Sequence, residues 1–271
     1  MQQNFSALKK VVLLICCITS NLFSYAVVRY VKTGGAGTAP YITWATASSD
    51  LQAVINACSA GDEIWIAAGT YKPNRRADAL TVSTPTDRND AFVLKNGVKV
   101  YGGFTGVEIA LNQRNSTTNV VTLSGDIGTV GVTTDNCYHV VICAGLSITT
   151  TLLDGVSIAS GNANAAVLVP NITVNTHSIN PRYGGGMYKV SSNIDLTDCR
   201  FRRNNASLSG AGVYENLSAV NSVYSNCTFT QNSSAGDGGG LYISTSSCLY
   251  QNCSFTSNDA TDDGGGIYSS G

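Results

Sequence analysis

The chain has 271 residues, of which 43% are hydrophobic and only 12% charged, and it contains 28 glycines. This is ordinary globular hydrophobicity with unusually few charges, a balance that suits a stacked, strand-rich body. The formal net charge of −1 argues against nucleic-acid binding, and no stretch after the N-terminal leader is apolar for the length of a transmembrane helix.

The first 26 residues have the organisation of a secretory signal peptide. Lys9 and Lys10 precede an apolar run at 11–18, and Ser24-Tyr25-Ala26 fits signal-peptidase cleavage after Ala26. The apolar run is too short for a membrane anchor, and a lipoprotein site at Cys16 is disfavoured because Ile15 stands where a small residue is required. Cleavage leaves 14 basic and 17 acidic residues, a formal charge of −3.

A strand and then a short helix open the exported part. Residues 28–32 alternate as a strand does. Ser49 is the predicted N-cap of a helix over about 49–59, with Asp50 in its first turn and one apolar face formed by Leu51, Val54, Ile55 and Cys58. We expect this amphipathic helix to cap the first coil of a β-structure, because an uncovered strand edge invites association.

Short strands without helices follow over residues 60–150. The candidate strands, punctuated by glycine and asparagine, lie at 63–67, 69–71, 92–94, 97–103, 120–123 and 138–142. Their uneven spacing predicts irregular first coils.

From about residue 150 the pattern becomes a repeat. Each of four tyrosines follows a glycine-rich tripeptide and one apolar residue, and each of three phenylalanines precedes an asparagine by three residues. Successive members of each series are 26 or 28 residues apart. The tyrosines are Tyr188, Tyr214, Tyr242 and Tyr268. The phenylalanines are Phe201, Phe229 and Phe255, and their asparagines are Asn204, Asn232 and Asn258. Strand-like segments repeating at about 26 residues, with no helix, are typical of a solenoid with one coil per repeat.

Strand alternation predicts what faces inward. In residues 199–202, Cys199 and Phe201 would point into the core and Arg200 and Arg202 outward, and 227–229 and 253–255 repeat this arrangement. Like residues then stack on like residues in coils about 4.8 Å apart. The predicted fold is all-β, a single-stranded right-handed parallel β-helix of residues 27–271 with an N-terminal capping helix.

The units that combine Phe-x-x-Asn with Gly-Gly-apolar-Tyr resemble the chlamydial polymorphic outer-membrane protein repeat, found in pectate-lyase-like right-handed β-helix proteins. The N-terminal half, at 50–55, 61–71 and 100–104, resembles the start of large secreted or surface proteins with such repeats. Together the resemblance covers nearly all of residues 28–271. The resemblance implies the architecture. It does not imply one activity, because such proteins include adhesins and autotransporter passengers.

Cysteine and histidine give no sign of a metal or redox centre. Seven cysteines remain after cleavage, and Cys199, Cys227 and Cys253 occupy equivalent positions whose parallel Cβ directions favour a buried thiol ladder over disulfides. His139 and His177 lie near no cysteine pair with zinc-ligand spacing, and His139 in a strand is interpreted as structural. The glycine triplets lack the lysine of a phosphate-binding loop.

Catalysis on this fold requires acidic and basic residues on one face of neighbouring coils. The densest outward charge set is Asp195, Asp198, Arg200, Arg202 and Arg203. The next coils carry Ser, Thr, Asn and Gln at the corresponding places, so we interpret the set as a solvated face. A carbohydrate- or ion-binding patch is the alternative, with Asp198 and Arg200 as the candidate catalytic pair. No cofactor is predicted. A calcium role for the corner aspartates 237, 259, 262 and 263 lacks the spacing of known calcium motifs.

We therefore predict an exported, secreted or surface-associated scaffold that is adhesin-like or ligand-binding. Its expected partner is a carbohydrate or the surface of a host or neighbouring cell. The alternatives are a polysaccharide lyase or glycoside hydrolase on the same fold, and a structural surface spacer. Because the chain stops three residues after the Tyr268 unit, we also expect it to be truncated, with outer-membrane association through a missing C-terminal region.

Overall fold

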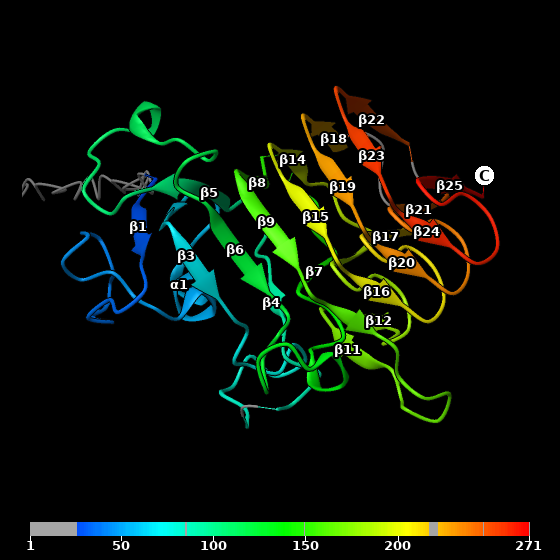
Figure 1. The fold of residues 1–271 in the computed structure, drawn as a ribbon. Helices are drawn as coiled ribbons and strands as arrows, with labels where there is room; N and C mark the ends of the chain where they lie inside the picture. Colours follow the sequence, from blue (N-terminus) through cyan, green and yellow to red (C-terminus); the bar gives the residue numbers. More distant parts are fainter. Residues whose placement is uncertain (1–25, 85, 149, 217–221, 246, 271) are drawn as a thin grey trace, which may run out of the picture.

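The computed structural model describes residues 26–84, 86–148, 150–216, 222–245 and 247–270. The chain winds into successive coils whose strands stack in three long parallel sheets, so the fold is an all-β parallel solenoid (Figure 1). The predicted fold class is thus confirmed. The predicted signal peptide lies outside the described residues except for Ala26.

Each coil after the first contributes one strand to each sheet, and the first contributes β1 to sheet 1 alone. Sheet 1 runs β1 (Val28–Val31), β2 (Glu63–Ala67), β5 (Lys99–Phe104), β8 (Leu152–Asp154), β14 (Asp195–Thr197), β18 (Ser222–Ser225) and β22 (Cys248–Gln251). Sheet 2 runs β3 (Gly69–Tyr71), β6 (Val121–Ser124), β9 (Val156–Ala159), β15 (Arg200–Arg202), β19 (Thr228–Thr230) and β23 (Ser254–Thr256). Sheet 3 runs β4 (Phe92–Val93), β7 (Val141–Ala144), β13 (Met187–Val190), β17 (Val213–Asn216), β21 (Leu241–Ser244) and β25 (Ile267–Ser269).

A short corner sheet completes the later coils. It consists of the two-residue strands β10 (Asn162–Ala163), β16 (Asn205–Ala206), β20 (Ser233–Ser234) and β24 (Asp259–Ala260). Asn162 is paired with Asn205, and the alanines that follow them are buried. The corner sheet thus presents polar side chains beside the small residues that close the core.

The interior is a set of ladders along the solenoid axis. Cys199, Phe201, Cys227 and Phe229 are fully buried, as alternation predicts. The rings of Phe201, Phe229 and Phe255 are stacked, with centroids 4.9 and 4.5 Å apart. Like residues therefore do stack on like residues, in register across neighbouring strands.

The first coil is closed by helix α1 (Leu51–Ala57), which is shorter than the predicted segment. Its N-cap is Asp50, whose carboxylate accepts a hydrogen bond from the backbone N–H of Ala53, and the prediction of Ser49 as N-cap was wrong. Leu51, Val54 and Ile55 pack into the same apolar interior as the inward residues of the strands. An amphipathic helix at this place therefore covers the end of the apolar interior.

Several insertions interrupt the early coils. Two short 3-10 helices, η1 (Leu111–Gln113) and η2 (Thr133–Asp135), lie where no helix was predicted. An antiparallel hairpin, β11 (Ile172–Val174) and β12 (His177–Ile179), makes the coil that begins at β8 longer than a regular repeat (Figure 1). Such segments carry no periodicity that would reveal them in the sequence.

The tyrosine ladder lies on the other face of sheet 3 from the apolar interior. Tyr188 and Tyr214 alternate with the inward residues of β13 and β17 and are nearly buried, in a second apolar cluster that includes Val174 and Ile179 of the hairpin. Tyr242 and Tyr268 continue the stack, with centroids 5.3 and 5.4 Å from the preceding ring. The repeat thus specifies two aromatic ladders, one inside and one outside.

Candidate functional site

A polar pocket lies beside the start of the corner sheet. Its volume is about 340 Å³, within the range of roughly 300–1,000 Å³ of small-molecule sites. All its side chains are polar, and it is lined by Thr133, Asn136, Gly161, Asn162, Asn164, Arg203 and Asn205. We call it the asparagine pocket.

The walls of the asparagine pocket come from three coils. Thr133 and Asn136 lie in the insertion between β6 and β7, Asn162 on β10, and Asn205 on β16. Asn162 joins them, because its Oδ1 accepts a hydrogen bond from Asn205 Nδ2 at 2.8 Å and its Nδ2 donates to the backbone oxygen of Thr133 at 2.7 Å. The coil stacking therefore fixes the positions of these amides.

Arg88 holds the pocket together from a separate loop. Its guanidinium donates to the backbone oxygens of Asn136 and Asn162, both at 2.7 Å, and to Asn164 Oδ1 at 2.6 Å. It also lies 4.2 Å from the centroid of the Tyr138 ring. A planar donor of this kind fixes several acceptors at once, so the pocket is preorganised.

Two side chains that line the pocket have unused hydrogen-bonding capacity. Asn136 is buried, its Nδ2 donates to the backbone oxygen of Ser160 at 2.7 Å, and its Oδ1 has no hydrogen-bond partner among the described residues. A buried acceptor without a partner is unfavourable unless a ligand or water supplies a donor. Arg203 is exposed, and its Nε donates to Gln231 Oε1 at 3.2 Å. It is the only charged side chain among the lining residues.

The predicted pair Asp198 and Arg200 lies on another edge, at the turn from β14 to β15. Asp198 has a left-handed backbone, and Arg200 donates to the backbone oxygen of Ser116 at 3.2 Å. Neither residue lines the asparagine pocket. Of the predicted charge set, only Arg203 does.

A second pair of opposite charges lies near Asp198. Arg114 donates to Asp154 Oδ2 at 2.6 Å, and its guanidinium lies over the Tyr101 ring. Burial raises the pKa of Asp154, the ion pair with Arg114 opposes this, and the charge of Asp198 adds to it. The structure thus adds Asp154 and Arg114, which sequence spacing did not reveal, to the Asp198 and Arg200 region.

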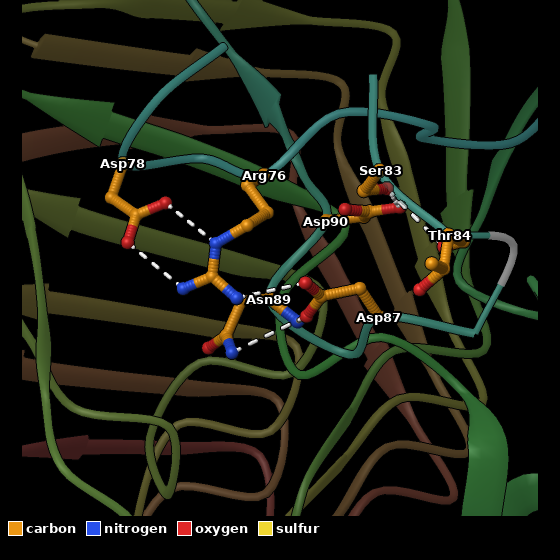
Figure 2. Close-up of polar contacts among 7 residues, drawn as sticks. All are labelled: Arg76, Asp78, Ser83, Thr84, Asp87, Asn89 and Asp90. Carbon is orange, nitrogen blue, oxygen red and sulfur yellow. Dashed lines mark hydrogen bonds and ion pairs between the residues drawn. The ribbon is translucent and has the colours of Figure 1, made fainter. Parts of the chain in front are cut away.

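The loop between β3 and β4 carries another charged cluster, shown in Figure 2. Arg76 bridges two aspartates, with contacts of 2.9 Å to Asp78 Oδ2 and 2.8 Å to Asp87 Oδ2. Asp90 is buried and accepts a 2.5 Å hydrogen bond from Ser83 Oγ. Arg76 pairs with both carboxylates, so the cluster holds the loop together, and its single positive charge balances one of the two negative charges.

A larger hollow of about 490 Å³ lies beside α1 and is mainly apolar, with Ile55, Leu80, Val93 and Leu146 among its walls. Lys95 is its only charged residue, and Lys95 Nζ donates to the backbone oxygens of Asn56 and Cys58. The charge is thus used to cap the end of α1. We therefore place the candidate site in the smaller, polar pocket.

His139 and most of the described cysteines are buried. His139 is buried, its Nδ1 lies 3.0 Å from the backbone oxygen of Gly184, and burial lowers its pKa to about 4. The described cysteines are free thiols, and Cys199, Cys227 and Cys253 each donate to a backbone oxygen of the preceding coil. No three His, Cys, Asp or Glu side chains among the described residues are placed to hold a metal ion. Within the same residues, no helix has the length and apolarity to cross a membrane.

Comparison with known proteins identifies the repeat. Residues 226–244 and 252–270 match the model of the Chlamydia polymorphic membrane protein repeat. Each match spans strands of sheet 2, the corner sheet and sheet 3, with one Phe, one Asn and one Tyr of the ladders. No curated protein and no solved structure matches the chain significantly. The resemblance predicted from the sequence is therefore confirmed for the last two coils.

Proposed function

We propose that this chain is an exported cell-surface β-helix that binds a saccharide unit bearing a carboxylate. The supporting observation is the asparagine pocket, in which amides meet one arginine and a buried oxygen, Asn136 Oδ1, has no partner among the described residues. Hydroxyl groups can donate to such an oxygen and accept from amide N–H groups. A guanidinium favours a carboxylate, because it offers two parallel donors.

The surface location is supported by the repeat match, since the matching family is described as a membrane protein repeat. It is also supported by the signal-peptide pattern of residues 1–26. A solenoid suits this role, because stacking repeats gives an extended flank on which a pocket is rigidly held.

Binding of digalacturonate, compared with the neutral digalactoside, tests the proposal by isothermal titration calorimetry. We expect the acidic sugar to bind. Arg203→Gln should lower the affinity for it about 10-fold or more, since hydrogen bonds to charged groups contribute about 1.5–3 kcal/mol. Asn136→Ala should lower the affinity for both sugars. The matched control is Arg200→Gln, which removes the same charge outside the pocket.

The second candidate function is cleavage of an acidic polysaccharide near Asp198. It is favoured by the gathering of Asp154, Arg114, Asp198 and Arg200 described above. Turnover of polygalacturonate, followed by released reducing ends, should then disappear in Asp198→Asn and Arg200→Gln while Arg203→Gln retains it. Absence of turnover by the unaltered protein removes this candidate for that substrate.

A further inference from the structure

Five polar side chains meet inside the solenoid, where the neighbouring ladders are apolar. Lys189 on β13 and Glu215 on β17 occupy paired positions of sheet 3 and are fully buried. Ser222 and Tyr224 on β18 and Cys248 on β22 reach them from sheet 1. We call these five residues the core cluster.

The contacts of the core cluster converge on one carboxyl group. Lys189 Nζ lies 3.0 Å from Glu215 Oε1. Tyr224 donates its hydroxyl proton to Glu215 Oε2 at 2.7 Å, and Cys248 Sγ lies 2.6 Å from Oε1. Ser222 Oγ accepts a hydrogen bond from Lys189 Nζ at 3.0 Å, which fixes the amine.

Stability alone does not explain these residues. The same stack along sheet 3 has Cys143 before Lys189 and Ile243 after Glu215, so apolar side chains fit this ladder. A buried ion pair loses the hydration of two charges, and apolar residues in its place are often as stable or more so. An amine and a carboxyl held in contact away from water are, however, arranged for condensation.

We propose that Lys189 and Glu215 form an isopeptide bond between two coils. One proton first passes from the ammonium to the carboxylate, which gives the neutral amine and acid that an apolar site favours. Lys189 Nζ then bonds to Cδ of Glu215, and the bond from Cδ to Oε1, the oxygen that received the proton, breaks. Oε1 leaves as water with that proton and one from the nitrogen, and Oε2 remains as the amide oxygen. The step is redox-neutral and needs no co-reactant.

The rest of the core cluster has defined roles in this step. The Tyr224 hydroxyl donates a hydrogen bond to Oε2 and stabilises the negative charge that develops on this oxygen when the amine attacks Cδ. Ser222 orients the amine. Fixed contact replaces a bimolecular encounter, and well-oriented intramolecular reactions reach effective molarities of about 10⁵–10⁸ M.

The chain contains a natural negative control. Lys99 on β5 and Glu63 on β2 also occupy paired positions, in sheet 1, but both are half-exposed. Water competes with the amine there, so we expect this pair to remain uncondensed. No ion pair joins Lys99 and Glu63 among the described residues, so the comparison separates a buried pair in contact from the mere pairing of Lys with Glu in register.

Mass spectrometry of the full-length folded protein tests the proposal. The intact mass should be lower than the sequence mass, after leader removal, by one water molecule. Trypsin should fail to cleave after Lys189 and should leave residues 183–200 joined to the peptide that begins at residue 204. Lys189→Met should have the full mass. Tyr224→Phe should accumulate the cross-linked form more slowly.

The proposal is overturned if Lys189 and Glu215 form an ion pair without a covalent bond. This outcome is recognised by a full intact mass and normal cleavage after Lys189 in protein that is folded by circular dichroism and has been incubated for days. A water loss that peptide mapping assigns to any other residue overturns it as well. If Lys189→Met does not fold, the tryptic peptides of the unaltered protein still decide the question.

Discussion

At the residue scale, Asp90 in the loop between β3 and β4 shows how one buried carboxyl makes stability depend on pH. Its Oδ1 has no hydrogen-bond partner among the described residues, and burial raises its pKa to about 6, with a further rise from Asp87. An unfolded aspartate has a pKa near 3.9, so the folded state binds the proton more tightly. The free energy of unfolding should therefore fall as pH rises from about 4 to about 6.

Asp90→Asn should remove this decline and keep a hydrogen-bond partner for Ser83. We expect it to stabilise the protein at pH 7 by about 2–3 kcal/mol, measured by urea unfolding at several pH values. The control is Asp78→Asn in the same loop, since hydrogen bonds from Arg76 lower the pKa of Asp78. That change should give no gain at pH 7. An unaltered slope between pH 4 and 6 in Asp90→Asn would contradict the interpretation.

The single residues of the two proposed sites were the hardest to predict from the sequence. Alternation correctly assigns Phe201 to the interior because its neighbours repeat in every coil. Lys189, Glu215 and Asn136 each occur once at their place in the coil, so no periodicity identifies them. Their environment depends on side chains from other coils, and only the stacking register brings these together.

At the scale of elements, α1 imitates a missing strand. Gln52 is buried, its Oε1 accepts from the backbone N–H of Val93 at 2.8 Å, and its Nε2 donates to the backbone oxygen of Val93 at 3.2 Å. β4 is the terminal strand of sheet 3, so this amide satisfies the edge as a neighbouring strand would. The sequence predicted a capping helix from its apolar face, whereas this polar contact needs the three-dimensional placement.

Gln52→Met should leave both backbone groups of Val93 unpaired in a buried place. We expect a loss of about 2–4 kcal/mol in the free energy of unfolding, because each buried unsatisfied group costs about 1–3 kcal/mol. The control is Asn56→Ala, which removes only the exposed partner of Gln52 Nε2. Guanidinium unfolding measures both variants, and equal losses would show that the amide does not protect the edge.

Asn204, Asn232 and Asn258 form a hydrogen-bonded asparagine ladder along the solenoid, and its contribution to stability can be tested. Asn232 is fully buried, donates to the backbone oxygen of Phe201 at 2.9 Å, and accepts from Asn204 Nδ2 at 3.0 Å. Asn232→Ala should lower the free energy of unfolding by about 2–4 kcal/mol, since partners in two coils lose their bonds. Thr228→Ala, an outward change on the same coil, should stay within about 1 kcal/mol. Thermal unfolding compares the two, and a similar effect of both would contradict a structural ladder.

At the scale of the whole molecule, the repeat determines the coil and the insertions determine the site. The period of Phe201, Phe229 and Phe255 predicts parallel stacking because identical coils must bury identical faces. The asparagine pocket needs in addition the aperiodic segments that carry Arg88 and Thr133. The parallel stacking could therefore be predicted, the insertions could not, and the pocket could be predicted only in part, through Arg203 of the charge set.

The distribution of thiols over the coils predicts how the folded protein reacts with a thiol reagent. Burial raises the pKa of Cys58 to about 11 and of Cys143 to about 12, so at pH 8 neither forms the reactive thiolate. Among the described cysteines, only Cys248 and Cys253 are partly exposed. Burial raises the pKa of Cys248 to about 12 as well, and the hydrogen bond with Cys227 raises the pKa of Cys253, so their reaction should be slow. We expect at most these two to react with an aromatic disulfide reagent in the native protein.

All seven cysteines that follow Ala26 should react in guanidinium without reductant. Whatever slow native reaction occurs should be reduced in Cys253→Ser and unchanged in Cys58→Ser. Fewer than seven reactive groups after unfolding would mean that export oxidises the ladder, and rapid reaction of all seven in the native state would mean that the coils open far more readily than their packing implies.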